Sequence, residues 1–156
     1  MAFDRSLGEN QLAVDNIQGD VLVGLQKDFQ IFVGFAIIDV TKFRNFLCIL
    51  TPRITTLRTT LEREFILNLR HDANSTEVFT FTGMNIGFTA AGLKALGIPD
   101  LDKINDGSFL AGLAARSDSL NDPKTGIGAK ANWVIGAPTQ ELHGILTITG
   151  PDKPSV

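Results

Sequence analysis

The feature that most restricts the fold is an apolar segment at residues 29–38 (FQIFVGFAII), where only positions 30, 34 and 36 lack a large apolar side chain. Apolar residues occupy odd and even positions alike, and aromatic and β-branched types predominate. A strand with one solvated face would alternate with polar residues, so this pattern predicts a strand that is covered on both faces. The candidate core or dimer-forming residues of this strand are Phe29, Ile31, Phe32, Val33, Phe35 and Ile37.

Helix signals follow this strand. Asp39 is typical of an N-cap, because apolar residues recur after it at helical spacing as far as Leu50. Thr51 and Pro52 together predict the start of a second helix, with a capping hydroxyl followed by proline at the first helical position. Apolar residues on one face carry the prediction of this second helix on to Phe65.

The remaining chain predicts further strands and short helices. Residues 78–86 and 142–149 are expected to be strands, with a brief extended piece at 133–135 between them. Thr89 is expected to cap a short helix that stops at Gly97, and another helix is expected at 108–115. This order predicts an α+β fold. We divide the chain into an N-terminal arm (1–16), one domain (17–150) and a tail (151–156), with no internal repeat.

Composition excludes several classes of protein. The 156 residues carry 44% hydrophobic side chains, enough for one globular core, and a formal net charge of −3. Because the basic residues are scattered, no nucleic-acid partner is expected. No apolar run reaches the roughly 18 residues that a membrane span needs. Residues 1–5 (MAFDR) place an acidic side chain where a signal peptide would have its apolar stretch, so no signal peptide is expected and the compartment is predicted to be cytoplasmic or reached by unconventional secretion.

Few residues are suited to catalysis or metal binding. Cys48 is the single cysteine and is expected to be a small buried hydrophobe. Of the two histidines, His71 is expected on the surface and His143 packed in or at the edge of the last strand; two separated histidines do not make a metal site. A Gly-Met-Asn-Ile-Gly stretch at 83–87 lacks the lysine of a phosphate loop. Asn74 begins a glycosylation sequon, which matters only if the chain is exported.

Five segments carry a resemblance to a known family: residues 15–24 (DNIQGDVLVG), 29–35, 85–97 (NIGFTAAGLKALG), 106–109 and 143–148. In this order they resemble the N-terminal part of fungal dye-decolorizing peroxidases, a family of haem enzymes. The resemblance runs from about residue 15 to 150. It implies a ferredoxin-like, dimeric α+β barrel type of fold. In that family a domain has the order strand-helix-strand-strand-helix-strand.

The resemblance implies no catalytic residues in this chain. The family uses a distal aspartate in a Gly-x-x-Asp-Gly motif, a distal arginine and a proximal histidine, and their counterparts would lie beyond residue 156. Residues 103–107 (KINDG) come closest to the aspartate motif but begin with lysine. His143 corresponds to a strand position and not to the iron ligand. We therefore expect no catalytic, cofactor-binding or metal-binding residues, with haem binding as the alternative.

The resemblance also implies an incomplete sheet. Only the first three strands of the family's four have counterparts here, which leaves an unpaired strand edge and uncovered apolar surface. We therefore expect a homodimer, with the sheets pairing edge to edge or packing face to face.

Three hypotheses for function follow. The first is a non-catalytic interaction protein that binds a protein or glycan, in the manner of small fungal lectins or immunomodulators. The second is a haem-binding peroxidase fragment or peroxidase-related enzyme, with His71 or His143 as an improvised axial ligand. The third is a cofactor-free enzyme that acts on an apolar molecule in a pocket lined by Phe35 and Phe81.

Overall fold

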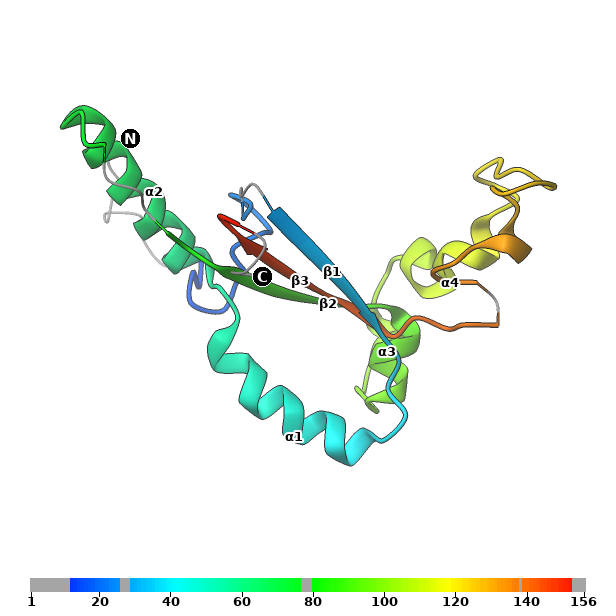
Figure 1. Ribbon diagram of the computed structural model, residues 1–156. Helices are drawn as coiled ribbons and strands as arrows, with labels where there is room; N and C mark the ends of the chain where they lie inside the picture. The colour runs from blue at the N-terminus through cyan, green and yellow to red at the C-terminus, as the bar shows by residue number, and fades with distance from the viewer. Residues whose placement is uncertain (1–11, 26–28, 77–79, 138, 153–156) are drawn as a thin grey trace.

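The computed structural model describes residues 12–25, 29–76, 80–137 and 139–152 (Figure 1). A three-stranded sheet lies at its centre. The elements are β1 (Phe29–Phe35), α1 (Val40–Leu50), a 3-10 turn (Thr51–Arg53), α2 (Leu57–Asp72), β2 (Gly83–Phe88), α3 (Ala90–Ala95), a 3-10 turn (Leu101–Lys103), α4 (Gly107–Arg116), a 3-10 turn (Lys130–Asn132) and β3 (Gly144–Gly150). Figure 1 shows α1 and α2 on one long connection between β1 and β2.

The sheet has the strand order β1-β3-β2. Both β1 and β2 pair antiparallel with β3, so β1 and β2 run parallel and need the helical crossover that α1 and α2 provide. Gly144 of β3 pairs with Phe35 on one side and Phe88 on the other. This arrangement confirms the predicted α+β, ferredoxin-like fold and gives its first three strands.

Several helix ends lie where the sequence predicts them. The Asp39 carboxylate accepts a hydrogen bond from Lys42 N–H at 3.0 Å and caps α1. The Thr89 hydroxyl accepts from Gly92 N–H at 3.0 Å and caps α3. Gly97, just beyond α3, has φ +67°, a left-handed conformation that glycine adopts without a steric cost.

The predicted start of the second helix at Thr51 and Pro52 is wrong. The Thr51 hydroxyl donates to Leu47 O at 2.7 Å, so it closes the end of α1 instead of capping a new helix. Residues Thr51–Arg53 form only a 3-10 turn, and α2 begins at Leu57. Thr56 is the true cap, because its side chain accepts from Thr59 N–H at 3.3 Å.

Three other segments differ from the predictions. β2 begins at Gly83 and ends at Phe88, whereas residues 80–82 precede the strand and 77–79 lie outside the described residues. Residues 133–135 are not a strand but follow a 3-10 turn through bends. The helix predicted at 108–115 is present as α4, with a break at Gly112, where φ is +74°. Gly112 allows the break because glycine adopts positive φ readily.

Part of the predicted arm is attached to the domain. Leu57 N–H donates to Ile17 O at 2.7 Å, and Arg58 N–H donates to Val14 O at 3.2 Å. Residues 12–16 are therefore fixed against the start of α2 and are not a separate arm. Residues 1–11 and 153–156, which hold the rest of the predicted arm and most of the tail, lie outside the described residues.

The buried apolar core is small. Its apolar members among the described residues are Leu25, Ile37, Leu50, Leu57, Leu96, Ala129 and Ala137. Cys48 is exposed, so its predicted burial is wrong. Within α1 only Leu50 is buried, so Cys48 lies on a part of the helix that the described residues leave uncovered. No helix within the described ranges is long and apolar enough to cross a membrane.

Candidate functional site

The candidate residues of β1 are mostly exposed. Phe32 is 61% exposed, and Phe29, Ile31 and Val33 are between 37% and 43% exposed. Phe35 is half-buried, and only Ile37, beyond the end of the strand, is buried. The described residues therefore do not cover β1 on both faces as the sequence predicts, and an apolar strand lies open to solvent.

The side chains of alternate residues in β1 share a face with apolar residues of the other strands. Register places Ile31 opposite Ile148 and Val33 opposite Leu146 on β3. β3 in turn pairs with Met84 and Ile86 of β2, so all three strands contribute. We call this the apolar sheet face; its residues are Phe29, Ile31, Val33, Phe35, Met84, Ile86, Phe88, Leu146 and Ile148.

Helix α1 packs on the apolar sheet face at the end formed by Phe35 and Phe88. Phe43 in the first turns of α1 has its ring centroid 5.1 Å from Phe35 and 6.4 Å from Phe88. Phe35 and Phe88 meet edge to face at 5.8 Å. Beyond this aromatic cluster, Leu50 at the end of α1 is also buried. The exposed apolar residues of the two helices are Phe46 and Ile49 in α1 and Phe65, Ile66, Leu67 and Leu69 in α2.

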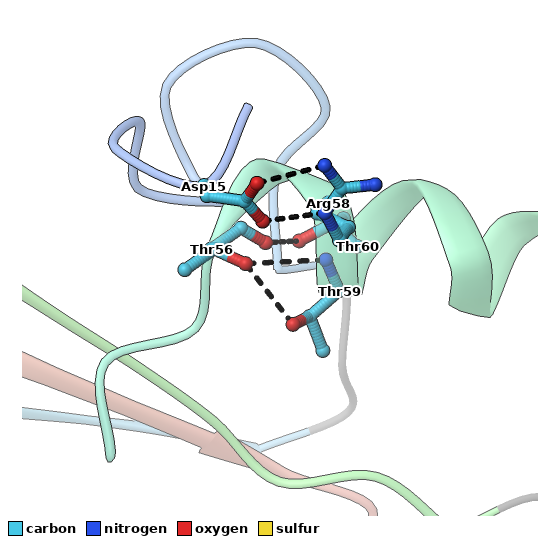
Figure 2. Close-up of polar contacts among 5 residues, drawn as sticks. All are labelled: Asp15, Thr56, Arg58, Thr59 and Thr60. Atoms are coloured by element: carbon cyan, nitrogen blue, oxygen red, sulfur yellow. Dashed lines mark hydrogen bonds and ion pairs between the residues drawn. The ribbon is translucent and has the colours of Figure 1, made fainter. Parts of the chain in front are cut away.

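Figure 2 shows how the N-terminal segment is held at the start of α2. Asp15 forms an ion pair with Arg58 through both carboxylate oxygens, one of them 2.7 Å from Arg58 Nη2. The hydrogen bonds from Arg58 lower the pKa of the Asp15 carboxyl, and Asp15 raises the pKa of Arg58. Thr60 lies in the same place, fully buried, with its hydroxyl donating to Thr56 O at 3.2 Å. Gly19 packs so closely on Thr60 that a side chain would clash there.

The outer edge of β2 is closed by two residues from outside the sheet. Ile86 N–H donates to Gln18 Oε1 at 2.7 Å, and Gln18 Nε2 donates to Ile86 O at 2.8 Å. Met84 N–H donates to Thr55 Oγ1 at 2.9 Å, and Thr55 N–H donates to Met84 O at 2.8 Å. Gln18 and Thr55 thus take the place of a neighbouring strand. Sequence reasoning missed both residues, because nothing local marks a side-chain amide that pairs with a strand distant along the chain.

His143 is packed, as predicted, with its side chain 13% exposed. Its Nδ1 accepts a hydrogen bond from Ile37 N–H at 2.8 Å, and Nε2 lies 3.4 Å from Glu141 Oε2. Because Nδ1 is the acceptor, a neutral ring carries its proton on Nε2 and has no lone pair to offer there. His143 thus ties β3 to the residues after β1.

Neither histidine fits the axial site of a haem. A histidine that ligates iron needs a free nitrogen lone pair, which His143 lacks while it accepts from Ile37 N–H. His71 is 91% exposed at the end of α2, with no closed pocket around it, as expected for a surface histidine. No group of three or more His, Cys, Asp or Glu residues within the described ranges could hold a metal ion.

Two shallow hollows lie at the end of β1. One, of about 570 Å³, is lined by Gly34, Phe35 and Leu142 together with residues 134–136 and 139–141. The other, of about 270 Å³, lies between Asp39 and the start of α1. Phe81, which the third hypothesis places in a pocket with Phe35, lines neither hollow and lies beside Arg63, whose guanidinium is 4.9 Å from its ring centroid.

A three-stranded antiparallel sheet of order 1-3-2 with helical crossovers is a ferredoxin-like domain. The family model described as "DyP dimeric alpha+beta barrel domain" matches residues 16–156, and the chain belongs to this family. A dye-decolorizing peroxidase of Exidia glandulosa is 31% identical over 144 residues, which are 92% of this chain and 25% of the relative. Dye-decolorizing peroxidase msp1 of Mycetinis scorodonius is 33% identical over 138 residues, which are 88% of this chain and 23% of the relative.

Solved structures show the same similarity. An ancestral D-type dye decolorizing peroxidase matches with a TM-score of 0.78 and 34% identity, covering 93% of this chain and 29% of that chain. A variant of the dye-decolorizing peroxidase from Pleurotus ostreatus matches with a TM-score of 0.79 and 26% identity, covering 93% and 30%. The resemblance to the N-terminal part of fungal peroxidases is therefore confirmed. This chain spans about a quarter of the length of the curated relatives.

Proposed function

We propose that this chain is a protein–protein interaction module on the scaffold of the dye-decolorizing peroxidases, without catalysis of its own, and that it acts as a homodimer. The observation that carries the proposal is the open apolar surface of β1, where Phe32 is 61% exposed and its neighbours are more than one-third exposed. Apolar strands of this length are normally covered or carry protective charges. β1 has no charged residue.

Covering this surface is energetically favourable. Transfer of the exposed part of a large apolar side chain out of water is worth about 1 kcal/mol when half of the side chain is already buried. Phe29, Ile31, Phe32 and Val33 together therefore provide a gross gain of about 4 kcal/mol per protomer. The exposed apolar residues of α1 and α2 add to this gain. A partner of normal interface size would cover them together.

The proposal includes the absence of bound haem. It is supported by the hydrogen bond from Ile37 N–H to His143 Nδ1 at 2.8 Å, which leaves no ring nitrogen free for iron. The relatives are peroxidases, so haem binding is the alternative that the experiment has to exclude. Lectin-like or immunomodulatory binding stays a prediction from the sequence, and any glycan or protein ligand would be a further partner of the same module.

One preparation tests both parts of the proposal. Haemin is titrated into the purified chain while the Soret band is recorded, and the molar mass is measured by sedimentation equilibrium at micromolar concentration. We expect no saturable, stoichiometric Soret shift and a mass of twice 16.9 kDa.

Matched variants decide the haem question. A one-to-one Soret shift that His143→Ala abolishes and His71→Ala leaves unchanged would establish haem binding at His143 and contradict the proposal. The reverse dependence would establish it at His71. A mass of 16.9 kDa at every concentration would contradict the homodimer.

A further inference from the structure

We infer that His143 is a pH-operated latch, which holds the corner between β1 and α1 while its ring is neutral and releases this corner when the ring takes up a proton. The corner consists of residues 36–38. The latch goes beyond the proposed function and is independent of the homodimer, because all of its groups lie within one protomer.

One hydrogen bond fixes the backbone of the corner. Ile37 N–H donates to His143 Nδ1 at 2.8 Å, and among the described residues no other hydrogen bond involves the backbone of residues 36–38. Ile37 is buried, whereas Ala36 and Ile38 on either side of it are exposed. Ile37 therefore anchors the corner, and its N–H needs an acceptor while it stays buried.

The backbone of His143 is fixed on both sides, so the ring cannot follow the corner if the corner moves. His143 N–H donates to Phe35 O at 2.9 Å, and Thr89 N–H donates to His143 O at 3.0 Å. Gly92 of α3 packs so closely on His143 O that a side chain at this position would clash. These backbone contacts do not titrate, and they set where Nδ1 lies at every pH.

Protonation of the ring removes the acceptor. A neutral imidazole has one lone pair, and in His143 this lone pair is on Nδ1 and faces Ile37 N–H. An imidazolium carries N–H donors on both nitrogens, so no rotation of the ring offers an acceptor to Ile37 N–H. This N–H is then left to water, which requires the corner to lift or water to enter beneath it. Histidine is the side chain that changes charge between about pH 5 and pH 8, which sets the range to examine.

Glu141 is the charged group that reaches the ring. Its Oε2 lies 3.4 Å from His143 Nε2, so the carboxylate favours the imidazolium, but it is 69% exposed and solvent screens the attraction. The other charged groups of the surrounding segments are Asp39, Lys42 and Arg44 at the start of α1 and Lys94 in α3. Asp39 and Lys42 pair with each other at 3.4 Å. Arg44 donates to Leu96 O at 2.6 Å, and Lys94 is exposed.

Release of the corner changes the surface at the end of β1. Ala36 lines both of the hollows found there, and Glu141 lines the larger one. Helix α1 stays on the sheet, because the Phe43 and Phe35 rings pack with centroids 5.1 Å apart and this contact carries no charge. The latch therefore alters the shape of the two hollows on acidification without separating α1 from the sheet.

Amide exchange of the native chain tests the latch. Exchange is followed by NMR from about pH 7.5 to about pH 5 and is expressed as a protection factor, which removes the intrinsic dependence of exchange on pH. We expect the protection of the Ile37 amide to fall about tenfold, because the acceptor of a buried donor is lost. The Thr89 amide, which donates to the backbone carbonyl of His143, is the internal control and should stay within about threefold.

Three variants separate the latch from a general loosening in acid. In His143→Asn the amide oxygen can accept from Ile37 N–H and does not titrate, so Ile37 protection should stay within about threefold across the range. His71→Asn changes the histidine that is 91% exposed and should keep the native fall. Glu141→Gln removes the carboxylate beside Nε2 and should move the midpoint of the fall by about 0.5 unit to lower pH.

Several results would overturn the inference. These are a native chain whose Ile37 protection does not fall, a native chain whose Thr89 protection falls equally, and a fall that persists in His143→Asn. A midpoint that Glu141→Gln leaves unchanged or raises would contradict the part assigned to Glu141. The native chain and Glu141→Gln both keep the His143 ring, so they decide the question even if His143→Asn does not fold.

Discussion

Replacing Gln18 with alanine removes the side chain that closes the β2 edge. Two hydrogen bonds to Ile86, at 2.7 Å and 2.8 Å, are lost, and the Ile86 N–H and C=O are left for water. A hydrogen bond of this kind contributes about 0.5–1.5 kcal/mol net, so the expected loss is about 1–3 kcal/mol of the free energy of unfolding. Gln18 is half-buried, and water reaches part of the site, which places the expectation at about 1–2 kcal/mol.

The assay is urea unfolding followed by circular dichroism at one fixed protomer concentration, because the proposed homodimer makes stability depend on concentration. The exposed Gln140→Ala is the control for loss of a glutamine side chain and should change stability by less than about 0.5 kcal/mol. Gln18→Glu tests the amide itself, since its carboxylate can accept from Ile86 N–H but cannot donate to Ile86 O. A Gln18→Ala variant as stable as Gln140→Ala would refute the reasoning, as would Gln18→Glu with native stability.

Two further outcomes are expected. Thr56→Ala should lower the free energy of unfolding in urea by about 1 kcal/mol, because it removes the N-cap of α2. Thr51→Ala, which lies outside that cap, should leave the start of α2 intact. Equal exchange protection of the first α2 amides in both variants would contradict the assignment of the cap to Thr56. Asp15→Asn removes a carboxylate whose pKa is lowered by Arg58. In the native chain, the stability that the charged carboxylate contributes is fully present above the ordinary pKa of 3.8 and is lost as the pH falls through the lowered pKa. The difference between native chain and variant should therefore shrink on acidification, and a difference that grows below pH 4 would contradict it.

Local signals in the sequence predict much of the fold. Asp39, Thr89 and Gly97 end or begin helices where expected, because a cap depends on residues within one turn of it. The start of α2 was mispredicted because Thr51 and Thr56 are both plausible caps. Only the bond from the Thr51 hydroxyl back to Leu47 O decides between them.

The candidate surface was identified in part. The sequence indicates the apolar residues of β1, but it predicts them to be covered, whereas the structure leaves Phe32 and its neighbours open. Burial depends on where α1 and α2 lie, and helical periodicity does not determine that. Cys48 was mispredicted for the same reason: an apolar neighbourhood in sequence is not an apolar neighbourhood in space.

The sequence by itself determined most of the element types, the apolar identity of β1 and the relation to the peroxidase family, because these depend on residue patterns that are read along the chain. Only the tertiary structure decided that Gln18 and Thr55 close the outer edge of β2. Gln18 and Ile86 are 68 residues apart, and their pairing exists only once the crossover brings β2 beside the N-terminal segment. Hydrogen bonds between distant segments follow from the path of the backbone in space, and local residue patterns do not encode that path.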